Sequence, residues 1–498
     1  MKKIITGAIG LAVLSFCLGV QNPAKAYIAT ADSSAAVVVG QGDMSSNQVN
    51  QGGAVSGSTE NSPCKAFVNG TKLFVADTSN HRVLIYNSVP TSNNAVADVV
   101  IGQTDVAGNT ANQGGAPAAN TLRYPVDVFT DGTKLIISDY GNNRVLIYNS
   151  IPTANNASAD VVIGQADMSH NSPNQGGAAS ASTLDDPYGV YYNGTKLFIS
   201  DKSNNRVLIY NSLPAANNAS ANVVVGQENM SSTNPNKGGN ASENTLSGPI
   251  GVYADNDKLI VSDFDNNRVL VFNSIPTSNN ASANVVVGQA NMNNTAANQG
   301  GAASASGMKN PHGVYVYNSK LYVADYENNR VLIYDSIPTT NNLPADRVIG
   351  QADMASATAN RGGAAGAATL YKPYSISASA EKLVIADREN NRTLIYDNQD
   401  VTANPSSIKY SKAKGKKKTV TLNFYGLSAD KTNKKYYTVK IGGAKMKVKS
   451  VKKYSDRVKV RVQYKYGKKA RDTYDVYLKY KYKSTTTIRT AENLVTIY

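Results

Sequence analysis

The feature that most constrains this chain is one segment that returns again and again at a constant interval, without an insertion. The segment DTSNHRVLIYNS begins at Asp77, the next copy begins at Asp139, and the same interval separates all the later copies. A Gly-Gln pair and a proline recur with the same period. Fixed-period self-similarity indicates a repeat architecture, in which each unit buries its apolar faces against its neighbours. The repeats cover residues 36–397, and the leading aspartates are Asp77, Asp139, Asp201, Asp263, Asp325 and Asp387.

Each unit contains four short β-rich runs separated by turns. In the third unit, YGVYY follows Pro187, KLFIS precedes Asp201, RVLIYN follows a KSNN turn, and NVVVGQ ends the unit. Asn193-Gly194 supplies the positive φ that a tight hairpin favours. Runs such as RVLIY are apolar on both faces, so each sheet must be covered on both sides. A ring of stacked four-stranded blades meets this requirement, and we predict an all-β fold with a six-bladed β-propeller over residues 27–403.

The repeated motifs P-x-G-V and L-x-V-A-D-x-x-N-N-R-V-L resemble the NHL repeat, and the intervening A-D-V-V-I-G-Q and N-Q-G-G segments look like its bacterial secreted versions. The resemblance covers all six units. The first unit departs from the motif with SPCKAF and the sixth with PYSIS, and both departures are expected to weaken an inner strand.

The order of the motifs predicts how the ring closes. A Gly-Gln pair precedes the first unit at Gly40, whereas none follows the last unit. The N-terminal AAVVVGQ is therefore expected to supply the outer strand of the sixth blade, with residues 36–40 pairing beside residues 392–397. Such a closure is non-covalent and leaves no exposed sheet edge.

The N-terminus is typical of an exported protein. Residues 1–26 combine MKK, the apolar run ITGAIGLAVLSFCLGV and the sequence Ala24-Lys25-Ala26, which together indicate a secretory signal peptide. The mature chain is expected to begin at Tyr27 and to act outside the cytoplasm, at the cell surface, in the periplasm or in the medium. No other stretch is long and apolar enough to span a bilayer. Cys64 is then the only mature cysteine, and we expect it to be a small packed residue.

Charge divides the chain into two parts. Residues 404–498 carry 26 Lys and Arg against 5 Asp and Glu, a net charge of +21, whereas residues 27–403 carry 21 against 30, a net charge of −9. The basic part alternates strictly, as in RVKVRVQYKY, and offers about six strands. This pattern predicts a small immunoglobulin-like β-sandwich over residues 404–498. Its NFYGL opening and VKIGG element resemble IPT/TIG-type domains.

A cationic sheet face has two interpretations. It can be a solvated surface that keeps sheet edges from pairing with other chains. Alternatively, it can attach the protein electrostatically to an anionic polymer of the envelope or matrix, and export argues against intracellular nucleic acid as the partner. The residues predicted for this attachment face are Lys459, Arg461, Lys465, Lys479 and Lys481.

The segment that follows each repeated aspartate predicts a structural corner. Asparagine tolerates the left-handed conformation of a compact turn, and the arginine that starts the next apolar run can form a charge-assisted bond with the aspartate. The predicted pairs are Asp77 with Arg82, Asp139 with Arg144, Asp201 with Arg206, Asp263 with Arg268, Asp325 with Arg330, and Asp387 with Arg392.

Ligand recognition is expected where the repeats differ. The residue after each proline should line the mouth of the channel, namely Cys64, Val126, Tyr188, Ile250, His312 and Tyr374. The residue after each aspartate should lie on the same face, namely Thr78, Tyr140, Lys202, Phe264, Tyr326 and Arg388. A mouth rich in tyrosine suits a protein, peptide or glycan ligand, bound by stacking and hydrogen bonds.

An enzyme is the alternative class. Six-bladed relatives include lyases, lactonases and sugar dehydrogenases with a metal in the channel, and a zinc site needs about three clustered ligands. The inner strands offer only His312 and Asp127, from opposite sides of the ring, while His81 lies in a corner and His170 in a loop. No nucleophile elbow, P-loop or dinucleotide fingerprint is present. The sequence therefore favours an exported, non-catalytic binding or scaffold protein without a cofactor or metal.

Overall fold

The computed structural model describes residues 34–397 apart from 256, and beyond them 401–404, 407–408, 417–425, 435, 437–441, 444–453, 457–465, 472–482 and 485–497. The expected signal peptide of residues 1–26 lies outside this part of the chain. No helix among the described residues is long and apolar enough to cross a membrane.

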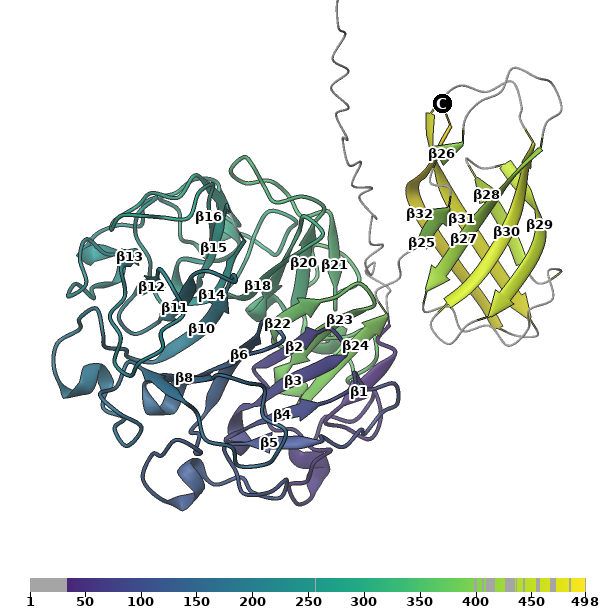
Figure 1. Ribbon diagram of the computed structural model, residues 1–498. Coiled ribbons are helices and arrows are strands. Elements are labelled where there is room, and N and C mark those ends of the chain that lie inside the picture. The colour runs from purple at the N-terminus through teal and green to yellow at the C-terminus, as the bar shows by residue number, and fades with distance from the viewer. Residues whose placement is uncertain are drawn as a thin grey trace, which may run out of the picture.

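The repeats form six four-stranded antiparallel blades around a channel, which confirms the predicted fold class (Figure 1). The first strand of each unit is innermost, and the inner strands contact one another around the ring. The first three blades are β2 (Lys65–Asn69), β3 (Lys72–Asp77), β4 (Arg82–Tyr86) and β5 (Val99–Ile101); β6 (Pro125–Thr130), β7 (Leu135–Asp139), β8 (Arg144–Tyr148) and β9 (Val161–Ile163); and β10 (Pro187–Tyr192), β11 (Leu197–Asp201), β12 (Arg206–Tyr210) and β13 (Val223–Val225). The next two are β14 (Pro249–Ala254), β15 (Leu259–Asp263), β16 (Arg268–Phe272) and β17 (Val285–Val287); and β18 (Pro311–Tyr317), β19 (Lys320–Asp325), β20 (Arg330–Tyr334) and β21 (Arg347–Ile349).

The sixth blade joins the two ends of the repeat region. It consists of β22 (Pro373–Ala378), β23 (Lys382–Asp387), β24 (Arg392–Asp397) and the N-terminal β1 (Val37–Val39). β1 runs antiparallel to β24, with Val37 opposite Ile395 and Val39 opposite Thr393. The ring is thus closed by hydrogen bonds between the first and last strands of the repeat region, which are the segments that the Gly-Gln order predicts to pair.

The blades stack because their middle strands are apolar on both faces. Val83, Leu84 and Ile85 of β4 are all fully buried, although neighbouring residues of a strand point to opposite faces. One face packs on the preceding blade and the other on the following blade. Burying each such side chain stabilises the fold by about 1.5–3 kcal/mol, and the repeated RVLIY run does this in every unit.

The glycine of P-x-G-V is required by close contact between inner strands. A Cβ on Gly189 would lie 2.3 Å from the carbonyl oxygen of Ile250 in the next blade. Where the glycine is replaced, a polar side chain bridges to the next strand instead: Ser375 Oγ accepts from the Ala66 amide at 3.0 Å, and Asp127 Oδ2 accepts from the Val190 amide at 3.0 Å. In the first unit the inner strand is shortened as expected, because β2 begins at Lys65 and no proline pairs with β3. In the sixth unit the inner strand is not shortened, because β22 begins at its proline, which pairs with β23.

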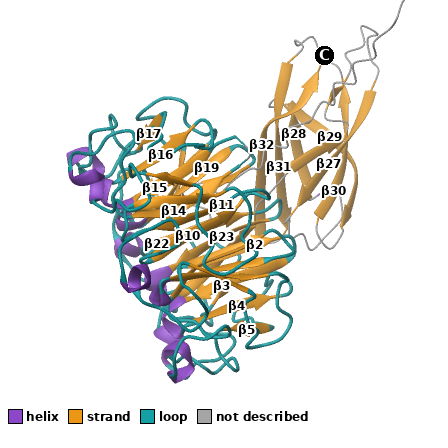
Figure 2. Cartoon of the chain, turned by 60° about the vertical axis from the view of Figure 1, so that its left-hand side comes forward, coloured by secondary structure: helices purple, strands orange, loops and turns teal. Residues whose placement is uncertain are grey.

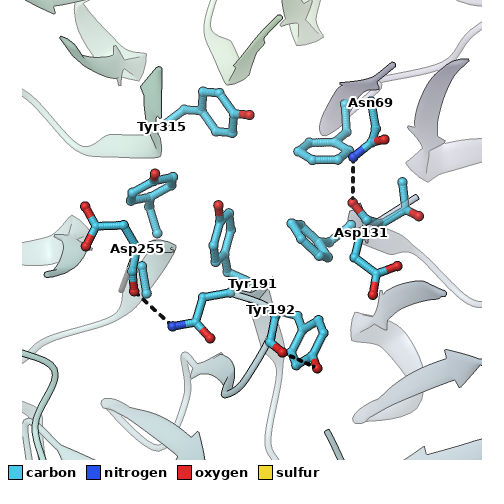
Figure 3. Close-up of a pocket in the computed structure, with 13 residues that line it drawn as sticks. Asn69, Asp131, Tyr191, Tyr192, Asp255 and Tyr315 are labelled. Atoms are coloured by element: carbon cyan, nitrogen blue, oxygen red, sulfur yellow. Dashed lines mark hydrogen bonds between the residues drawn. The ribbon is translucent and has the colours of Figure 1, made fainter. Parts of the chain in front are cut away.

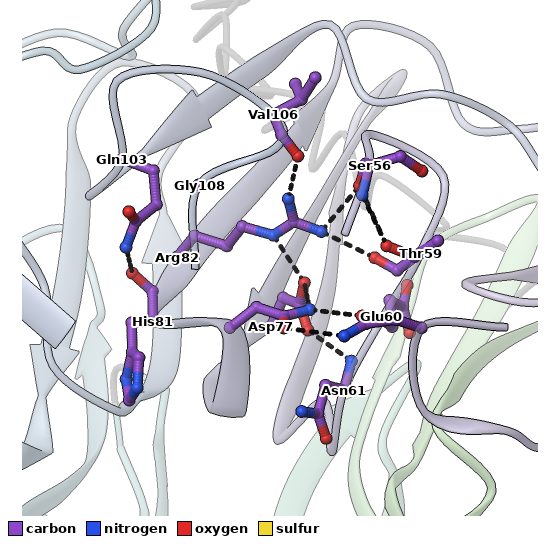
Figure 4. A network of polar contacts seen from close by, with 12 residues as sticks. Ser56, Thr59, Glu60, Asn61, Asp77, His81, Arg82, Gln103, Val106 and Gly108 are labelled. Atoms are coloured by element: carbon purple, nitrogen blue, oxygen red, sulfur yellow. Dashed lines mark hydrogen bonds and ion pairs between the residues drawn. The ribbon is translucent and has the colours of Figure 1, made fainter. Parts of the chain in front are cut away.

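The repeated aspartate and arginine form a buried network at each corner (Figure 4). In the first blade, Arg82 Nε lies 2.7 Å from Asp77 Oδ2, and both side chains are fully buried. The other guanidinium nitrogens of Arg82 donate to the carbonyls of Val106, Ser56 and Thr59 at 2.5, 2.8 and 2.8 Å. The arginine therefore ties the corner turn η2 (Thr78–Asn80) to the loops before and after its blade. In the sixth blade, the equivalent Arg392 donates to Met44, which strengthens the closure.

The corner aspartates are saturated with donors. Asp77 accepts from the Asn61 amide at 2.7 Å and from Asn80 Nδ2 at 2.8 Å, in addition to its bond with Arg82. Asn80 in turn exchanges hydrogen bonds with Asn50 of the 3-10 turn η1 (Val49–Gly52). Such turns gather on one side of the ring (Figure 2). These bonds of Asp77 and Arg82 run to groups of the corner itself and of the neighbouring loops, which is the geometry expected of a structural corner.

The C-terminal strands form one sheet in the order β25-β27-β30-β29-β28-β31-β32-β26. They are β25 (Val401–Asn404), β26 (Ser407–Ile408), β27 (Lys417–Tyr425), β28 (Tyr437–Ile441), β29 (Ala444–Lys453), β30 (Arg457–Lys465), β31 (Asp472–Tyr482) and β32 (Thr485–Ile497). The start of β29 pairs with β28, and its later part pairs with β30. β29 thereby joins two halves, and β25 also contacts β32. The likeness to immunoglobulin and IPT/TIG-type domains stays a prediction.

The predicted attachment face lies on β30 and β31. Arg461 is exposed, Lys459 is half-buried, and Val460 between them is buried, as the alternation predicts. The side chains of Lys465, Lys479 and Lys481 lie outside the described residues. Other exposed basic side chains on β28 and β29 are Lys440, Lys447, Lys449 and Lys452.

Candidate functional site

One end of the channel is the predicted mouth, and side chains from opposite blades narrow it. Tyr188 of the third blade and Tyr374 of the sixth share a hydrogen bond of 2.8 Å between their hydroxyls. His312 lies 4.0 Å from the Tyr374 ring, measured between centroids, and is only 3% exposed. Three of the six residues that follow the prolines therefore meet across the channel and narrow its mouth.

The residues that follow the aspartates cover these three side chains. Tyr140 contacts Tyr188 at 5.1 Å between ring centroids, and Phe264 and Tyr326 contact His312 at 4.8 and 4.3 Å. Three cations lie over the rings, each measured to the ring centroid: Lys202 at 5.3 Å from Tyr188, Arg388 at 5.4 Å from Tyr374 and Lys372 at 5.1 Å from Tyr326. The structure thus assembles eight of the nine predicted binding residues in one cluster, and their role as a ligand site stays a prediction.

Burial sets the charge states in this cluster. It lowers the pKa of His312 well below its usual range, and the positive charges of Arg388, Lys202 and Lys372 lower it further. Burial also raises the pKa of the Cys64 thiol. Both groups are therefore neutral near pH 7, and Cys64 packs on the first inner strand as expected, with its thiol 3.7 Å from the Ser62 carbonyl.

Asp127, the ninth predicted residue, lies deeper in the channel. Its Oδ1 is 2.9 Å from Nζ of Lys65 on the neighbouring inner strand. Together they border an internal cavity of about 30 Å³ that the inner-strand glycines and Tyr188 also line. Among the described residues, no three His, Cys, Asp or Glu side chains are grouped as metal ligands would be.

The opposite end of the channel is open and aromatic (Figure 3). A cavity of about 420 Å³ is lined there by the ends of the inner strands and their hairpins. Five aromatic residues at one repeat position surround it in a closed circle, with neighbouring ring centroids 4.8–6.3 Å apart. This aromatic circle consists of Phe67, Phe129, Tyr191, Tyr253 and Tyr315.

The sixth blade lets the circle close with five rings. Its equivalent residue, Ser377, is small, and its hydroxyl accepts a hydrogen bond from the Val68 amide at 2.8 Å. Tyr315 of the fifth blade therefore reaches Phe67 of the first blade directly, at 6.3 Å between centroids. Phe67 and Phe129 are buried, whereas Tyr191 and Tyr315 are half-buried and face the cavity.

The hairpins add a polar rim to this pocket. Four residues line it at equivalent repeat positions, namely Asn69, Asp131, Asn193 and Asp255. Asn69 Nδ2 donates to the Thr130 carbonyl at 3.1 Å, and Asn193 Nδ2 donates to the Asp255 carbonyl at 2.9 Å. Burial raises the pKa of Tyr253 to about 12, so the phenol remains a neutral hydrogen-bonding group. None of the described residues that line the pocket is basic.

Sequence reasoning missed this pocket. The signal was present, because an aromatic residue recurs with the period of the repeats from Phe67 to Tyr315. The residues that vary most between repeats follow each proline and each aspartate, and they lie at the other end of the same strands, so sequence variation pointed to that end as the ligand site. The pocket is much larger than the cavity beside Asp127 at the other end of the channel, and it is the candidate functional site.

Comparisons with known proteins identify the repeat. Residues 246–272 match the NHL repeat family. No curated protein matches the chain significantly. Among solved structures, apo AztD from Citrobacter koseri is similar with 12% sequence identity and a TM-score of 0.34, covering 68% of this chain and 83% of AztD.

Proposed function

Because the chain is a β-propeller of NHL repeats, we propose that it is an exported, non-catalytic binding protein. Its propeller recognises a protein, peptide or glycan, and its basic C-terminal domain holds it to an anionic polymer of the envelope or matrix. The two roles are assigned to different parts of the chain because the charge of one part is opposite to that of the other.

The aromatic pocket is the observation that carries the recognition role. Ligand pockets are concave, largely preformed and lined by aromatic groups with a few placed polar groups, in cavities of about 300–1,000 Å³. The cavity of about 420 Å³ inside the aromatic circle has these properties. Its walls are held by the packed inner strands, so a ligand would meet a rigid surface. The cavity beside Asp127 and Tyr188, at the end that the tyrosines narrow, has a volume of only about 30 Å³.

The C-terminal charge supports the attachment role. A net charge of +21 over residues 404–498 produces a strong attraction for polyanions at low ionic strength. Arg461 and four lysines on β28 and β29 are exposed on the described strands. For an exported chain, such an attraction would keep the propeller near the envelope.

Ligand screening with paired variants tests the recognition role. The mature chain would be titrated with a panel of envelope glycans and peptides, and binding partners would then be tested against Tyr191→Ala and Tyr188→Ala. Both tyrosines are half-buried and lie on β10, at opposite ends of the channel. We expect Tyr191→Ala to weaken binding at least tenfold and Tyr188→Ala to leave it unchanged. The reverse pattern would place recognition at the narrowed end, and a panel without any ligand would argue against a binding role.

A further inference from the structure

We propose that the aromatic pocket binds an organic ammonium group, carried either by a small amine or by a lysine side chain of a peptide. This inference rests on the proposed recognition role and gives the pocket a ligand class. It combines three observations: a circle of mutually tilted rings, two carboxylates that the fold does not need, and the absence of an opposing positive charge among the described lining residues.

The rings form a wall around the cavity and do not provide a flat surface for stacking. Neighbouring planes are tilted by 44° between Phe67 and Phe129, 55° between Phe129 and Tyr191, and 51° between Tyr191 and Tyr253. The remaining two contacts, which involve Tyr315, are close to perpendicular at 76° and 80°. A sugar that stacks needs one exposed flat face, whereas a compact cation is stabilised by several rings at once, because each ring carries negative charge on its faces.

The rim carboxylates supply charge beyond what their turns require. Asp131 Oδ1 accepts from the amides of Thr133 and Lys134, and Asp255 Oδ1 accepts from the amides of Asp257 and Lys258. In the third blade, Asn193 Oδ1 makes the same two bonds, to the amides of Thr195 and Lys196. An asparagine therefore serves this turn as well as an aspartate does. The negative charges of the second and fourth blades are left to act on the pocket.

No described cation cancels these charges at the rim. Lys65 Nζ lies 5.8 Å from the centroid of the Phe67 ring, but it is paired with Asp127 deeper in the channel at 2.9 Å. Lys134 of the hairpin bonds instead to Asn149, the residue that follows β8, at 3.1 Å. A pocket with low-dielectric aromatic walls and uncancelled carboxylates focuses negative potential, which attracts a cation.

Choline and its uncharged isostere, 3,3-dimethylbutan-1-ol, test the inference on the mature full-length chain. The two molecules have nearly the same shape, so calorimetric titration separates charge from fit. We expect choline to bind at least tenfold more tightly than the alcohol. We also expect the double variant Asp131→Asn and Asp255→Asn to weaken choline binding at least fivefold. Equal binding of choline and the alcohol, no binding of either choline or the lysine analogue Nα-acetyl-lysine N-methylamide, or unchanged affinity in the double variant would overturn the inference.

Matched controls identify the source of the effect. Asp257→Asn removes the same charge from an exposed position on the hairpin of Asp255, outside the pocket lining, and should leave choline affinity unchanged. The asparagines should preserve the turns, as Asn193 does, which thermal unfolding would verify. Titration with Nα-acetyl-lysine N-methylamide distinguishes the two sources: tighter binding than choline assigns the pocket to a lysine side chain, and weaker binding assigns it to a small amine.

Failure of this inference can be told apart from failure of the recognition role. If a neutral glycan or peptide binds and loses affinity in Tyr191→Ala, while choline and the lysine analogue do not bind, the pocket is a recognition site of another class. If Tyr191→Ala changes the affinity of no ligand at all, the pocket is not the recognition site, and both the assignment of recognition to this pocket and the ammonium inference are wrong.

Discussion

Replacing Glu60 by Leu together with Thr393 by Val should stabilise the closure of the ring. Glu60 is fully buried between the first blade and the closing blade, packed on Gly40. At the equivalent positions the chain has Leu122, Leu184, Leu246, Met308 and Leu370, and at the positions equivalent to Thr393 it has valine. The double variant therefore restores the apolar contact that the other interfaces between blades already use.

The expected gain follows from the hydrogen bonds of the carboxyl group. Glu60 Oε2 accepts from Thr393 Oγ1 at 3.1 Å, whereas no donor among the described residues reaches the buried Oε1. A buried polar atom without a partner costs about 1–3 kcal/mol. We expect the double variant to gain about that amount. Thr393→Val alone should lose about 1–3 kcal/mol, because it removes the donor to Oε2 and leaves the buried carboxyl in place.

The stability change should also depend on pH. Burial, and the nearby charge of Asp77, raise the pKa of Glu60 well above 4.5 in the folded protein. The protonated carboxyl is favoured in the folded protein, so its contribution to the free energy of unfolding is complete below pH 4.5. This contribution is lost as the pH rises through the folded pKa, because the buried group must then ionise. The advantage of the double variant over the native chain should grow by about 1.4 kcal/mol per pH unit above 4.5 until the folded pKa is reached.

Hydrogen exchange measures this closure locally. The amide of Ala36 donates to Ile395 and that of Val38 to Asn93, so exchange of the peptide that contains β1 reports opening of the sixth blade. A gain of about 1.4 kcal/mol corresponds to tenfold slower exchange when opening and reclosing are fast relative to chemical exchange of the open amide. Faster exchange in the double variant, or an advantage that does not change between pH 5 and pH 8, would refute the reasoning.

Three further predictions concern the scaffold and the attachment face. Arg144→Ala should destabilise the fold by about 3–5 kcal/mol, because it leaves Asp139 buried and unpaired; ligand affinity of the folded fraction should not change, and lost binding at full stability would make the corner a site. Gly189→Ala should cost about 1–3 kcal/mol or more in chemical unfolding, because the new Cβ meets the Ile250 carbonyl at 2.3 Å; an unchanged midpoint would show that the inner strands can separate. The mature chain should sediment with anionic envelope polymer at low salt and be released by several hundred millimolar NaCl, as the Debye length shortens from about 8 Å toward 3 Å. Reversing Lys459, Arg461, Lys465, Lys479 and Lys481 to Glu should abolish that retention, and a native chain that never sediments would leave the basic face with a solubilising role alone.

Most of the scaffold is readable from the sequence because it depends on local, repeated features. The constant repeat period determines the number of blades, and the order of the Gly-Gln pairs determines which segment closes the ring. The pairing of Asp77 with Arg82 spans a single short turn. The alternation of apolar residues and the turn residues determine structure over only a few positions each. The strands and turns inferred for one unit therefore apply to all six.

Which end of the channel is open was decided by tertiary structure. Both ends of the inner strands repeat with the same period, so spacing alone could not show which end is open. Tyr188 and Tyr374 are far apart in the sequence, yet their hydroxyls meet across the channel axis and narrow one end. At the other end, small Ser377 lets Tyr315 reach Phe67, which completes the aromatic circle. Side chains from different blades meet only once the ring has closed, and their sizes then determine which end can admit a ligand.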